Sequence, residues 1–274
     1  MSAALLVFAL AIPGATHATT FTVTNTLSCN AAGCGSLRRA IIDANASTAT
    51  PHTIQFNIPA CSPTPCVATI NLTTALPAIT RANVTIDGTT QTDTNSGVLG
   101  AGGTVGVDGL ALSTVNKPDI EIVDGGSFTV GLDVQANNTT IRGLAIYGFG
   151  SNAANGNIRI GNNFTGTLIE QNVIGSTATS FTDPGAGTRT GGSNIYSAGG
   201  DSGTIQNNLI GFANSFGVLG DTASTGWLIQ NNEIRGNGIG SAVQDGISFE
   251  AAGSGNTQIQ GNLVTGNKGV GIDS

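Results

Sequence analysis

The sequence predicts an all-β fold, a right-handed parallel β-helix in which short strands stack coil upon coil. The first observation is a five-fold repeat of an aliphatic residue, two polar or small residues, usually Asn, any residue and a second aliphatic residue. The copies begin at Ile141, Ile169, Ile205, Ile229 and Ile259. Their starts are 28, 36, 24 and 30 residues apart. This period matches one solenoid coil with insertions between copies.

A second observation is period-2 alternation ahead of the copies, with an aliphatic residue pointing one way and a variable residue the other. The alternating segments begin at Gly131, Asn157, Asn194, Gly217, Gly246 and Gly269. Such alternation is typical of a short half-buried strand. Two short strands per coil, joined by Gly- and Asn-rich turns, are therefore expected.

Composition agrees with a solenoid, which grows in one direction and needs no single globular core. The 274 residues include 41 glycines, and only 9% of them are charged. A formal net charge of −7 argues against nucleic acid or an anionic membrane as partner. Aromatic residues make up 5% of the chain, so stacking platforms for sugars or bases are scarce.

The repeated Asn has a structural explanation in this fold. It occurs as Asn172, Asn208, Asn232 and Asn262. Stacked strands lie roughly 4.8 Å apart, so these amides can bond to one another up the stack. We interpret them as an asparagine ladder and not as a catalytic or ligand site. The isoleucines that begin the copies are predicted to stack as one buried column.

The N-terminal eighteen residues are typical of an export signal. An apolar run from Ala3 to Ile12 precedes a small-residue site that ends at Ala18. The run is too short to span a bilayer, and no later run is long enough. The rest of the chain is therefore expected to be secreted, with no transmembrane segment.

The N-terminal elements follow in order. Residues 21–24 are predicted to form a strand, and Ser36 is a natural N-cap for an amphipathic helix. The apolar face of that helix carries Leu37, Ala40, Ile41 and Ala44. A helix of this kind can cover the open apolar end of a β-stack and block edge pairing.

The first coils and one excursion come next. Alternation predicts strands over residues 54–58, 68–72, 76–79 and 84–86. Residues 89–106 are polar and Gly-rich, which predicts a surface excursion before the strand pattern resumes at 120–122. The domains are thus a signal peptide (1–18), an N-terminal cap (19–58) and β-helix coils (59–274). Because residue 274 falls inside a coil, a longer parent chain is expected.

Four cysteines form two close pairs, Cys29 with Cys34 and Cys61 with Cys66. In an exported chain this spacing favours two local disulfides, each contributing roughly 2 kcal/mol. Connectivity across the pairs stays open. A four-Cys zinc site is the competing interpretation, which the spacing permits.

The N-terminal segment resembles a known family. The run Gly35-Ser-Leu-Arg-Arg-Ala-Ile-Ile-Asp-Ala-Asn45, with the later segments 54–59, 75–79 and 84–88, is similar to the start of bacterial right-handed parallel β-helix surface proteins. Their signature is often Cys-Ser-Leu-Arg-Glu-Ala. Here Gly35 separates Cys34 from Ser36, and Arg39 stands where that form has Glu.

The resemblance implies a pectate-lyase-like coil and a secreted or bacterial cell-surface location, in many members with an adhesin-like architecture. It does not imply one reaction. Enzymes on this fold usually act on polysaccharides, lyases with an Arg or Lys base and Ca²⁺, hydrolases with grouped Asp residues. No stretch of this chain matches either set of motifs.

Few side chains are candidates for chemistry. His52 is the only histidine after the signal, and we interpret it as a surface residue. Two cross-coil ion pairs are expected, Arg142 with Glu170 and Asp133 with Arg159, each contributing roughly 0–1 kcal/mol. Either Arg could instead be a lyase base. Pairing is the simpler interpretation.

Two classes of function remain. The first is a non-catalytic exported stalk, adhesin or module that contacts a polysaccharide or cell-surface glycan, and the second is a polysaccharide lyase or glycoside hydrolase. Low charge, missing motifs and few aromatics favour the first. No cofactor is required.

One metal site is conceivable. Counting three residues beyond the aliphatic position of each alternating segment gives Asp221, Glu250 and Asp273 in the last three coils. If they stack, the carboxylates lie roughly 5 Å apart and could hold Ca²⁺. The alternative is three solvated acids at strand ends.

Overall fold

Three parallel sheets form the body of the molecule, described by a computed structural model for residues 18–59, 66–92, 94–221, 224–240, 244–249 and 255–274. Sheet A contains β1 (Thr19–Val23), β2 (His52–Phe56), β4 (Val84–Asp87), β11 (Thr140–Arg142), β14 (Leu168–Glu170), β17 (Thr204–Gln206), β20 (Leu228–Gln230) and β23 (Gln258–Gln260). Sheet B contains β3 (Ala68–Leu72), β9 (Ile120–Asp124), β12 (Leu144–Tyr147), β15 (Val173–Ile174), β18 (Leu209–Gly211), β21 (Glu233–Arg235) and β24 (Leu263–Thr265). Sheet C contains β10 (Val130–Val134), β13 (Gly156–Ile160), β16 (Ser193–Ser197), β19 (Val218–Gly220), β22 (Ile247–Ser248) and β25 (Ile272–Asp273).

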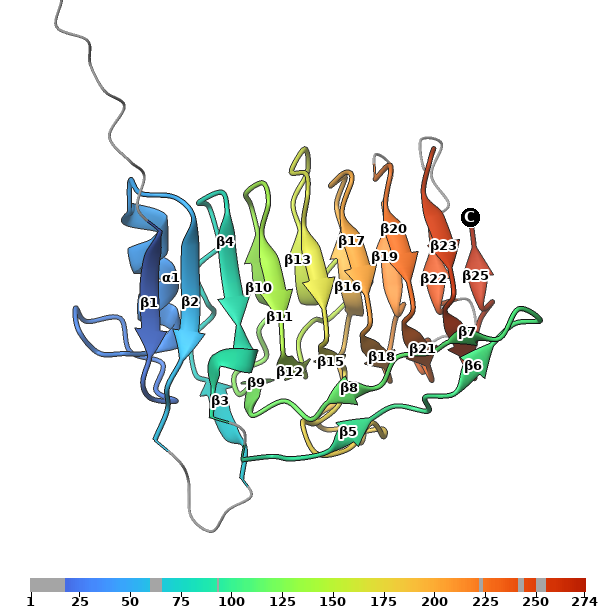
Figure 1. Ribbon diagram of the computed structural model, residues 1–274, viewed down its shortest axis with the longest axis horizontal. Helices are drawn as coiled ribbons and strands as arrows, with labels where there is room; N and C mark the ends of the chain where they lie inside the picture. Colours follow the sequence, from blue (N-terminus) through green and yellow to red (C-terminus); the bar gives the residue numbers. More distant parts are fainter. Residues whose placement is uncertain (1–17, 60–65, 93, 222–223, 241–243, 250–254) are drawn as a thin grey trace, which may run out of the picture.

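These sheets confirm the predicted fold class, a right-handed parallel β-helix. From β10 onward the chain visits sheets C, A and B in turn, and each strand pairs in parallel with its counterpart in the next coil. Figure 1 shows the coils side by side along the long axis of the molecule. Every inward-facing side chain therefore stacks on its counterpart one coil away.

A coil contains three strands, so the expectation of two was wrong. The repeat that looked like one strand is a strand of sheet A and a strand of sheet B joined by a corner of left-handed backbone. The corner residues have φ between 55° and 69°: Gly143, Gln171, Asn207, Asn231 and Gly261. Asn and Gly are the residues that adopt this conformation most readily.

The predicted isoleucine column is confirmed. Parallel pairing places the five isoleucines in one register within sheet A: Ile141, Ile169, Ile205, Ile229 and Ile259. The first four are buried and the fifth is partly buried. The same column continues back through Ile86 to Ile54.

The repeated asparagines stack directly behind the corners. Asn172 Nδ2 donates to Asn208 Oδ1 (3.1 Å), Asn208 Nδ2 to Asn232 Oδ1 (3.0 Å) and Asn232 Nδ2 to Asn262 Oδ1 (2.9 Å). Each amide also donates to a backbone carbonyl, as Asn208 does to Ile169 (2.9 Å). The ladder thus satisfies backbone groups that the tight corner leaves without strand partners.

A second ladder runs through the corner between sheets B and C. Asn157 Nδ2 donates to Asn194 Oδ1 (2.7 Å), Asn194 Nδ2 to Asn237 Oδ1 (2.9 Å) and Asn237 Nδ2 to Asn267 Oδ1 (2.9 Å). The first two asparagines are the second residues of strands of sheet C, whereas the last two follow strands of sheet B. The rungs meet in space although they occupy different positions of the coil sequence.

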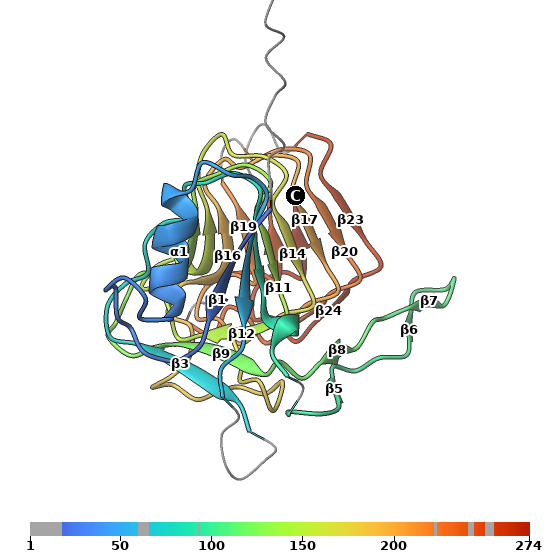
Figure 2. The same cartoon turned by 60° about the vertical axis from the view of Figure 1, so that its left-hand side comes forward.

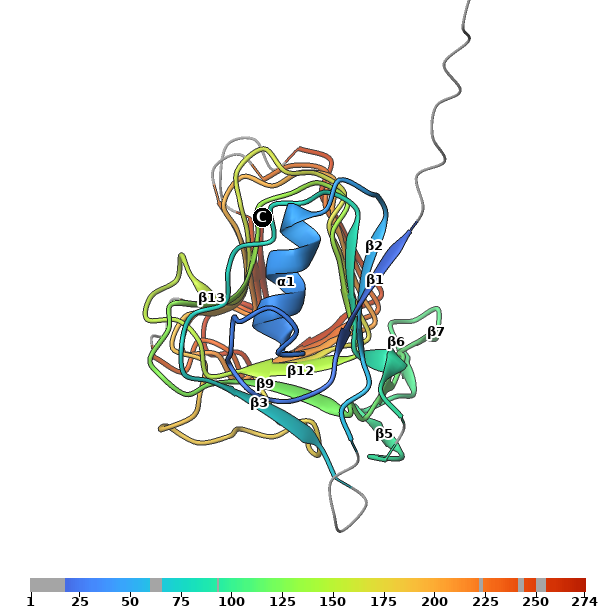
Figure 3. The same ribbon diagram turned by 90° about the vertical axis from the view of Figure 1, so that its left-hand side faces the viewer.

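The predicted helix forms as α1 (Leu37–Ala46), with Ser36 as its N-cap. The Ser36 hydroxyl accepts the Arg39 N–H (3.1 Å) and donates to the Cys29 carbonyl (2.5 Å). Viewed along the stack in Figure 3, α1 lies across the opening of the first coils. No helix of the described residues is long and apolar enough to cross a membrane.

The early strands largely match their predicted positions, as β1, β2, β3, β4 and β9. The exception is residues 76–79, where only Ile79 makes an isolated bridge, to Val134. The backbone there follows Pro77, which has no N–H to give to a ladder.

The predicted excursion is longer than expected and partly structured. After a 3-10 turn, η1 (Gly88–Thr90), two short antiparallel pairs form: β5 (Val98–Leu99) with β8 (Val115–Asn116), and β6 (Thr104–Val105) with β7 (Leu110–Ala111). We call residues 95–117 the arm. Figure 1 shows it running along the sheet B side of the coils toward the C-terminal end of the stack, and in Figure 2 its β6–β7 end projects away from them.

The root of the arm packs on the outer face of sheet B. Val115 belongs to a small apolar cluster with Val173 and Leu209, and Leu99 packs against it. Asn95 Nδ2 donates to the Ala178 carbonyl (3.0 Å) and so ties the arm to the loop after β15. Arm and loop together form a second layer over sheet B.

The cysteines pair locally where the structure describes them. Cys29 and Cys34 form a disulfide with a Cα–Cα distance of 6.3 Å, so neither thiolate is left for a metal. Cys66 is also disulfide-bonded. Cys61 lies outside the described residues, as do residues 1–17 of the expected signal.

Candidate functional site

The predicted acidic column does not form in the expected register. Asp221 follows β19, but Asp273 pairs with Ser248 and lies in the column of Leu219 and Tyr196. Glu250 lies outside the described residues. Asp221 and Asp273 therefore point out of sheet C from different columns, and no group of three His, Cys, Asp or Glu among the described residues could hold a metal.

The error comes from a duplicated pattern in the last coil. Residues 269–272 contain two Gly-aliphatic dipeptides, and the chain uses the second: Gly246 N–H donates to the Val270 carbonyl (3.1 Å) and Ile247 N–H to Gly271 (3.0 Å). Ile272 therefore stacks on Ile247. The sequence prediction counted from Val270 instead of Ile272, and it therefore assigned Asp273 to a column two residues away from the one that Asp273 occupies.

The outer face of sheet C carries a shallow cavity of about 360 Å³ whose lining includes Tyr196, Phe216, Leu219 and Asp221. The Tyr196 hydroxyl donates to Asp221 Oδ2 (2.7 Å). Burial and this hydrogen bond raise the pKa of Tyr196 to about 12. The phenol therefore stays protonated and holds Asp221 in place.

The outer face of sheet A carries a longer polar row. One outward side chain per coil lies in register along six strands: Asp87, Arg142, Glu170, Gln206, Gln230 and Gln260. We call this set the polar row. It runs beside the corner between sheets A and B, with neighbouring members roughly 4.8 Å apart.

Its first three members are charged. Arg142 Nη2 lies 2.6 Å from Asp87 Oδ2, and Arg142 Nη1 lies 3.8 Å from Glu170 Oε1, the second being the predicted pair. Burial raises the pKa of Asp87, but hydrogen bonds from Arg142 and Thr89 outweigh it and hold that pKa below its ordinary value. The bond to Asp87 in turn raises the pKa of Arg142.

Glutamines continue the row with one polarity. Gln206 Nε2 donates to Glu170 Oε2 (2.9 Å), Gln230 Nε2 to Gln206 Oε1 (2.9 Å) and Gln260 Nε2 to Gln230 Oε1 (3.0 Å). An ionised carboxylate only accepts hydrogen bonds, so Glu170 fixes which way Gln206 points. Gln206 in turn fixes the orientation of Gln230, and so on along the row.

A groove of about 490 Å³ lies alongside the charged end of the row. One wall is the corner residues Gly88, Gly143 and Gln171, each of which directly follows a charged member of the row. The other wall is the arm root, including Val98 and Asn116. The arm thus converts an open corner into a trough.

Several polar side chains of the groove have structural roles. Gln91 Nε2 and Oε1 bond to the carbonyl and N–H of Ile58 (2.9 and 2.8 Å). Asp119 Oδ1 accepts the N–H groups of Thr94 (2.8 Å) and Asn95 (2.9 Å). These contacts hold the base of the arm and leave little of either side chain for a ligand.

Other groove residues offer free polar groups. Thr114, Asn116 and Gln171 are exposed, and Lys117 is half-buried. Lys117 makes no ion pair within the part of the chain that the structure describes. The groove therefore presents hydroxyl, amide and ammonium groups beside the apolar side chains of Val98 and Val115.

His52 is not the surface residue that the sequence suggested. It is the first residue of β2, is 1% exposed and lies 5.7 Å from the Phe21 ring. Neither ring nitrogen makes a hydrogen bond of normal geometry, and only a weaker contact with the Ala49 backbone acts to raise the pKa. Burial and the nearby charge of Arg81 lower the pKa of His52, so it is neutral and buried. It does not face the groove or the polar row.

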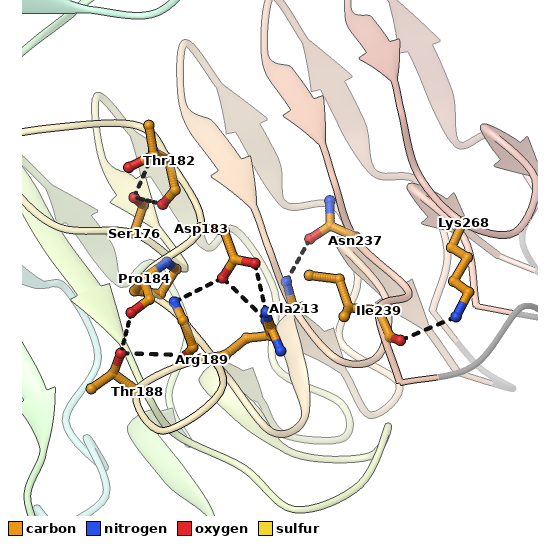
Figure 4. A network of polar contacts seen from close by, with 11 residues as sticks. Ser176, Thr182, Asp183, Pro184, Thr188, Arg189, Ala213, Asn237, Ile239 and Lys268 are labelled. Carbon is orange, nitrogen blue, oxygen red and sulfur yellow. Dashed lines mark hydrogen bonds and ion pairs between the residues drawn. The ribbon is translucent and has the colours of Figure 1, made fainter.

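The second predicted ion pair lies on sheet C, where Arg159 Nη1 is 3.6 Å from Asp133 Oδ2. A further pair closes the loop after β15, where Arg189 Nη2 is 2.5 Å from Asp183 Oδ2 and lowers the pKa of Asp183. Figure 4 shows this loop held by its own contacts, including Ser176 with Thr182. The Arg189–Asp183 pair therefore stabilises the loop itself.

Sequence reasoning missed the polar row and the groove. The signal for the row was present, because an Ile-Gln dipeptide begins three successive copies of the repeat at Ile205, Ile229 and Ile259. The groove left no such signal, since its two walls are distant in sequence. No known family matches this chain, and no curated protein matches it.

Proposed function

We propose that this chain is an exported or cell-surface β-helix protein that contacts a glycan without catalysis, through the outer face of sheet A. The polar row carries the proposal. It presents hydrogen-bonding side chains at a regular spacing along six coils of one face. An extended polysaccharide presents hydroxyl groups at regular intervals in the same way.

The glutamines keep hydrogen-bonding capacity for a ligand. A glutamine amide has two N–H donors and a carbonyl oxygen with two lone pairs. Within the row, Gln230 uses one donor and one lone pair on its neighbours. The remaining donor and lone pair suit the hydroxyl groups of a neutral sugar. Leu168 and Leu228, in the adjacent outward column, add apolar contact for the C–H faces of sugar rings.

The charged end of the row supports binding more than catalysis. A lyase base must give up its proton before it can accept one from the substrate. The raised pKa of Arg142 keeps its guanidinium protonated. Arg159, the other candidate base, is paired with Asp133.

A polysaccharide lyase is the second candidate, and Lys117 is the observation that favours it. This lysine lines the groove and makes no ion pair with any described residue. A lysine beside a bound sugar could act as the base of an elimination. The other charged side chain that lines the described part of the groove, Asp119, is already bonded to the N–H groups of Thr94 and Asn95.

Retention of the purified protein on glycans tests the proposal. Cellulose, xylan, pectin and alginate are the probes, and Gln230→Leu is compared with Gln135→Leu, the same change directly after β10 of sheet C. We expect the wild type to be retained on at least one of these glycans. Gln230→Leu should weaken the affinity for that glycan about fivefold or more, which corresponds to the loss of about one hydrogen bond between uncharged groups. Gln135→Leu should not weaken it.

Two results oppose the proposal. If Gln230→Leu and Gln135→Leu are retained equally, the polar row is not the contact surface. New reducing ends or lyase absorbance, abolished by Lys117→Gln, would replace a binding function with an enzymatic one.

A further inference from the structure

Glu233 is one of two buried glutamates in its column, the other being Glu121 of β9, and apolar side chains occupy the positions next to it in the neighbouring coils. On the outer face of sheet B the corresponding positions of β12, β15, β18 and β24 are occupied by Ala145, Val173, Leu209 and Leu263. Glu233 takes this position in β21 and is 1% exposed. A buried carboxylate is costly unless it is paired and hydrogen-bonded, so its partners explain its presence.

The partner on one side is the arm. Glu233 Oε2 accepts a hydrogen bond from the Ala101 N–H at 2.6 Å, although the two residues are 132 positions apart in the chain. A hydrogen bond to an ionised acceptor is shorter and stronger than one between neutral groups. No hydrogen bond from the arm to a coil strand beyond Ala101 is present among the described residues.

The second partner is Arg235, two residues further along β21, whose Nη1 lies 3.1 Å from Glu233 Oε1 in an ion pair without hydrogen-bond geometry. The guanidinium lies 4.6 Å from the centroid of the Phe181 ring and donates to the Phe181 carbonyl (2.5 Å). Phe181 belongs to the loop after β15. The carboxylate is therefore held in a fixed position by the second layer over sheet B.

The backbone of the arm is fitted to this contact. Gly100, the residue before Ala101, has φ +101°, a conformation that L side chains rarely adopt. A Cβ there would lie 2.9 Å from Leu209 Cδ2 and 3.3 Å from Glu233 Oε2. Glycine thus lets the arm approach sheet B closely enough for the Ala101 N–H to reach the carboxylate.

The arm root is also one wall of the groove. Val98 precedes Ala101 by three residues, and its pairing partner Asn116 lines the same wall. Beyond Ala101 the pair β6 and β7 leaves Val107 and Leu110 exposed. The position of the wall therefore depends on how firmly the arm is held at Ala101.

We propose that Glu233 is a positioning residue that latches the arm over sheet B and so sets the width of the groove beside the polar row. The residue itself does not contact the groove. It acts through the Ala101 N–H and the β5–β8 pair. The effect on glycan binding rests on the proposed function, whereas the latch itself does not.

Amide hydrogen exchange of the full chain tests the latch. Glu233→Leu restores the aliphatic residue of the neighbouring coils and removes the acceptor. We expect amide exchange at Leu99, Ala101 and Lys117 to accelerate about ten- to a hundredfold, which corresponds to the loss of one charge-assisted hydrogen bond. Exchange in β17 and β20 should be unchanged. Glu233→Gln keeps an acceptor oxygen and should give a smaller acceleration.

A variant in the arm guards against misfolding of the coils. Ala101→Pro removes the N–H donor without altering sheet B and should accelerate exchange at Leu99 and Lys117 as Glu233→Leu does. If arm exchange is unchanged in both variants, the latch is wrong. If the arm opens but retention on cellulose, xylan, pectin and alginate is unaffected by Glu233→Leu and also by Gln230→Leu, the proposed function is wrong and the latch stands.

Discussion

The asparagines at the corners stabilise the coils, and only some of them could be identified from the sequence. Asn172 and Asn208 could be placed in one ladder because each holds the same position of the repeat. Asn194 and Asn237 could not, because one lies within a strand and the other follows one. A repeat alignment compares positions in the coil, whereas a ladder needs only that two amides meet in space.

Asn208→Ala is expected to cost roughly 1–3 kcal/mol of stability, because buried groups lose their partners. Asn208 Oδ1 accepts the N–H of Asn172 (3.0 Å), and Asn208 Nδ2 donates to the carbonyls of Ile169 and Gln206 (both 2.9 Å). Denaturant unfolding measures the loss. Asn30→Ala, at an exposed position, is the control and should change stability by less than about 0.5 kcal/mol.

His52 predicts a pH dependence. Its folded pKa lies below the ordinary 6.5, so the folded state binds fewer protons than the unfolded chain. Stability should therefore fall as the pH drops below about 6.5 and level off below the folded pKa. Thermal unfolding of wild type and His52→Leu between pH 7.5 and 4.5 measures it. As the pH falls, the melting temperature of the wild type should decrease relative to that of His52→Leu. A difference in melting temperature that does not change with pH would contradict a buried neutral imidazole.

At the scale of elements, α1 was predictable because its signals are local. An N-cap and an apolar face at helical spacing lie within one short run of sequence. The arm was not predictable, because its strands have two residues each and its anchor, Glu233, is 132 positions away. The last strand was misplaced because two Gly-aliphatic dipeptides compete and only pairing with β22 selects one.

Ser36→Ala should destabilise the protein by about 1–2 kcal/mol, because α1 loses its N-cap. The buried hydroxyl bonds both the Arg39 N–H and the Cys29 carbonyl, so the cap also ties the helix to the preceding loop. Chemical denaturation measures the change. Ser28→Ala serves as the control, since its hydroxyl bonds only the exposed Thr74 hydroxyl (3.1 Å). An equal effect of both substitutions would contradict the capping role.

At the scale of the whole molecule, the fold was predictable because a solenoid repeats one local rule. The spacing of aliphatic residues was enough to place Ile141 to Ile259 in one column. The candidate site was predictable only where it reuses that rule, as in the pair Arg142 and Glu170. The groove lies between the coils and an excursion, and nothing in the coil repeat encodes it.

The loss of stability caused by an Ile→Ala substitution in the isoleucine column should depend on how deeply the residue lies within the stack. Ile205→Ala removes a side chain packed between coils on both sides and is expected to cost roughly 2–5 kcal/mol. Ile259→Ala makes the same change in the same column at a partly buried position, and should cost clearly less. Unfolding free energies of the two variants provide the comparison. Equal costs would contradict the packing of the column.

The corner between sheets A and B, only one or two residues long, determines where foreign sequence can be grafted into the molecule. One residue added beside Asn207 would displace Asn208 from its ladder and turn the following side chains to the opposite face. A peptide grafted at Gly187 meets open space in a loop that closes through its own contacts. The coils can therefore display an added segment on the side of sheet B while keeping their own register unchanged.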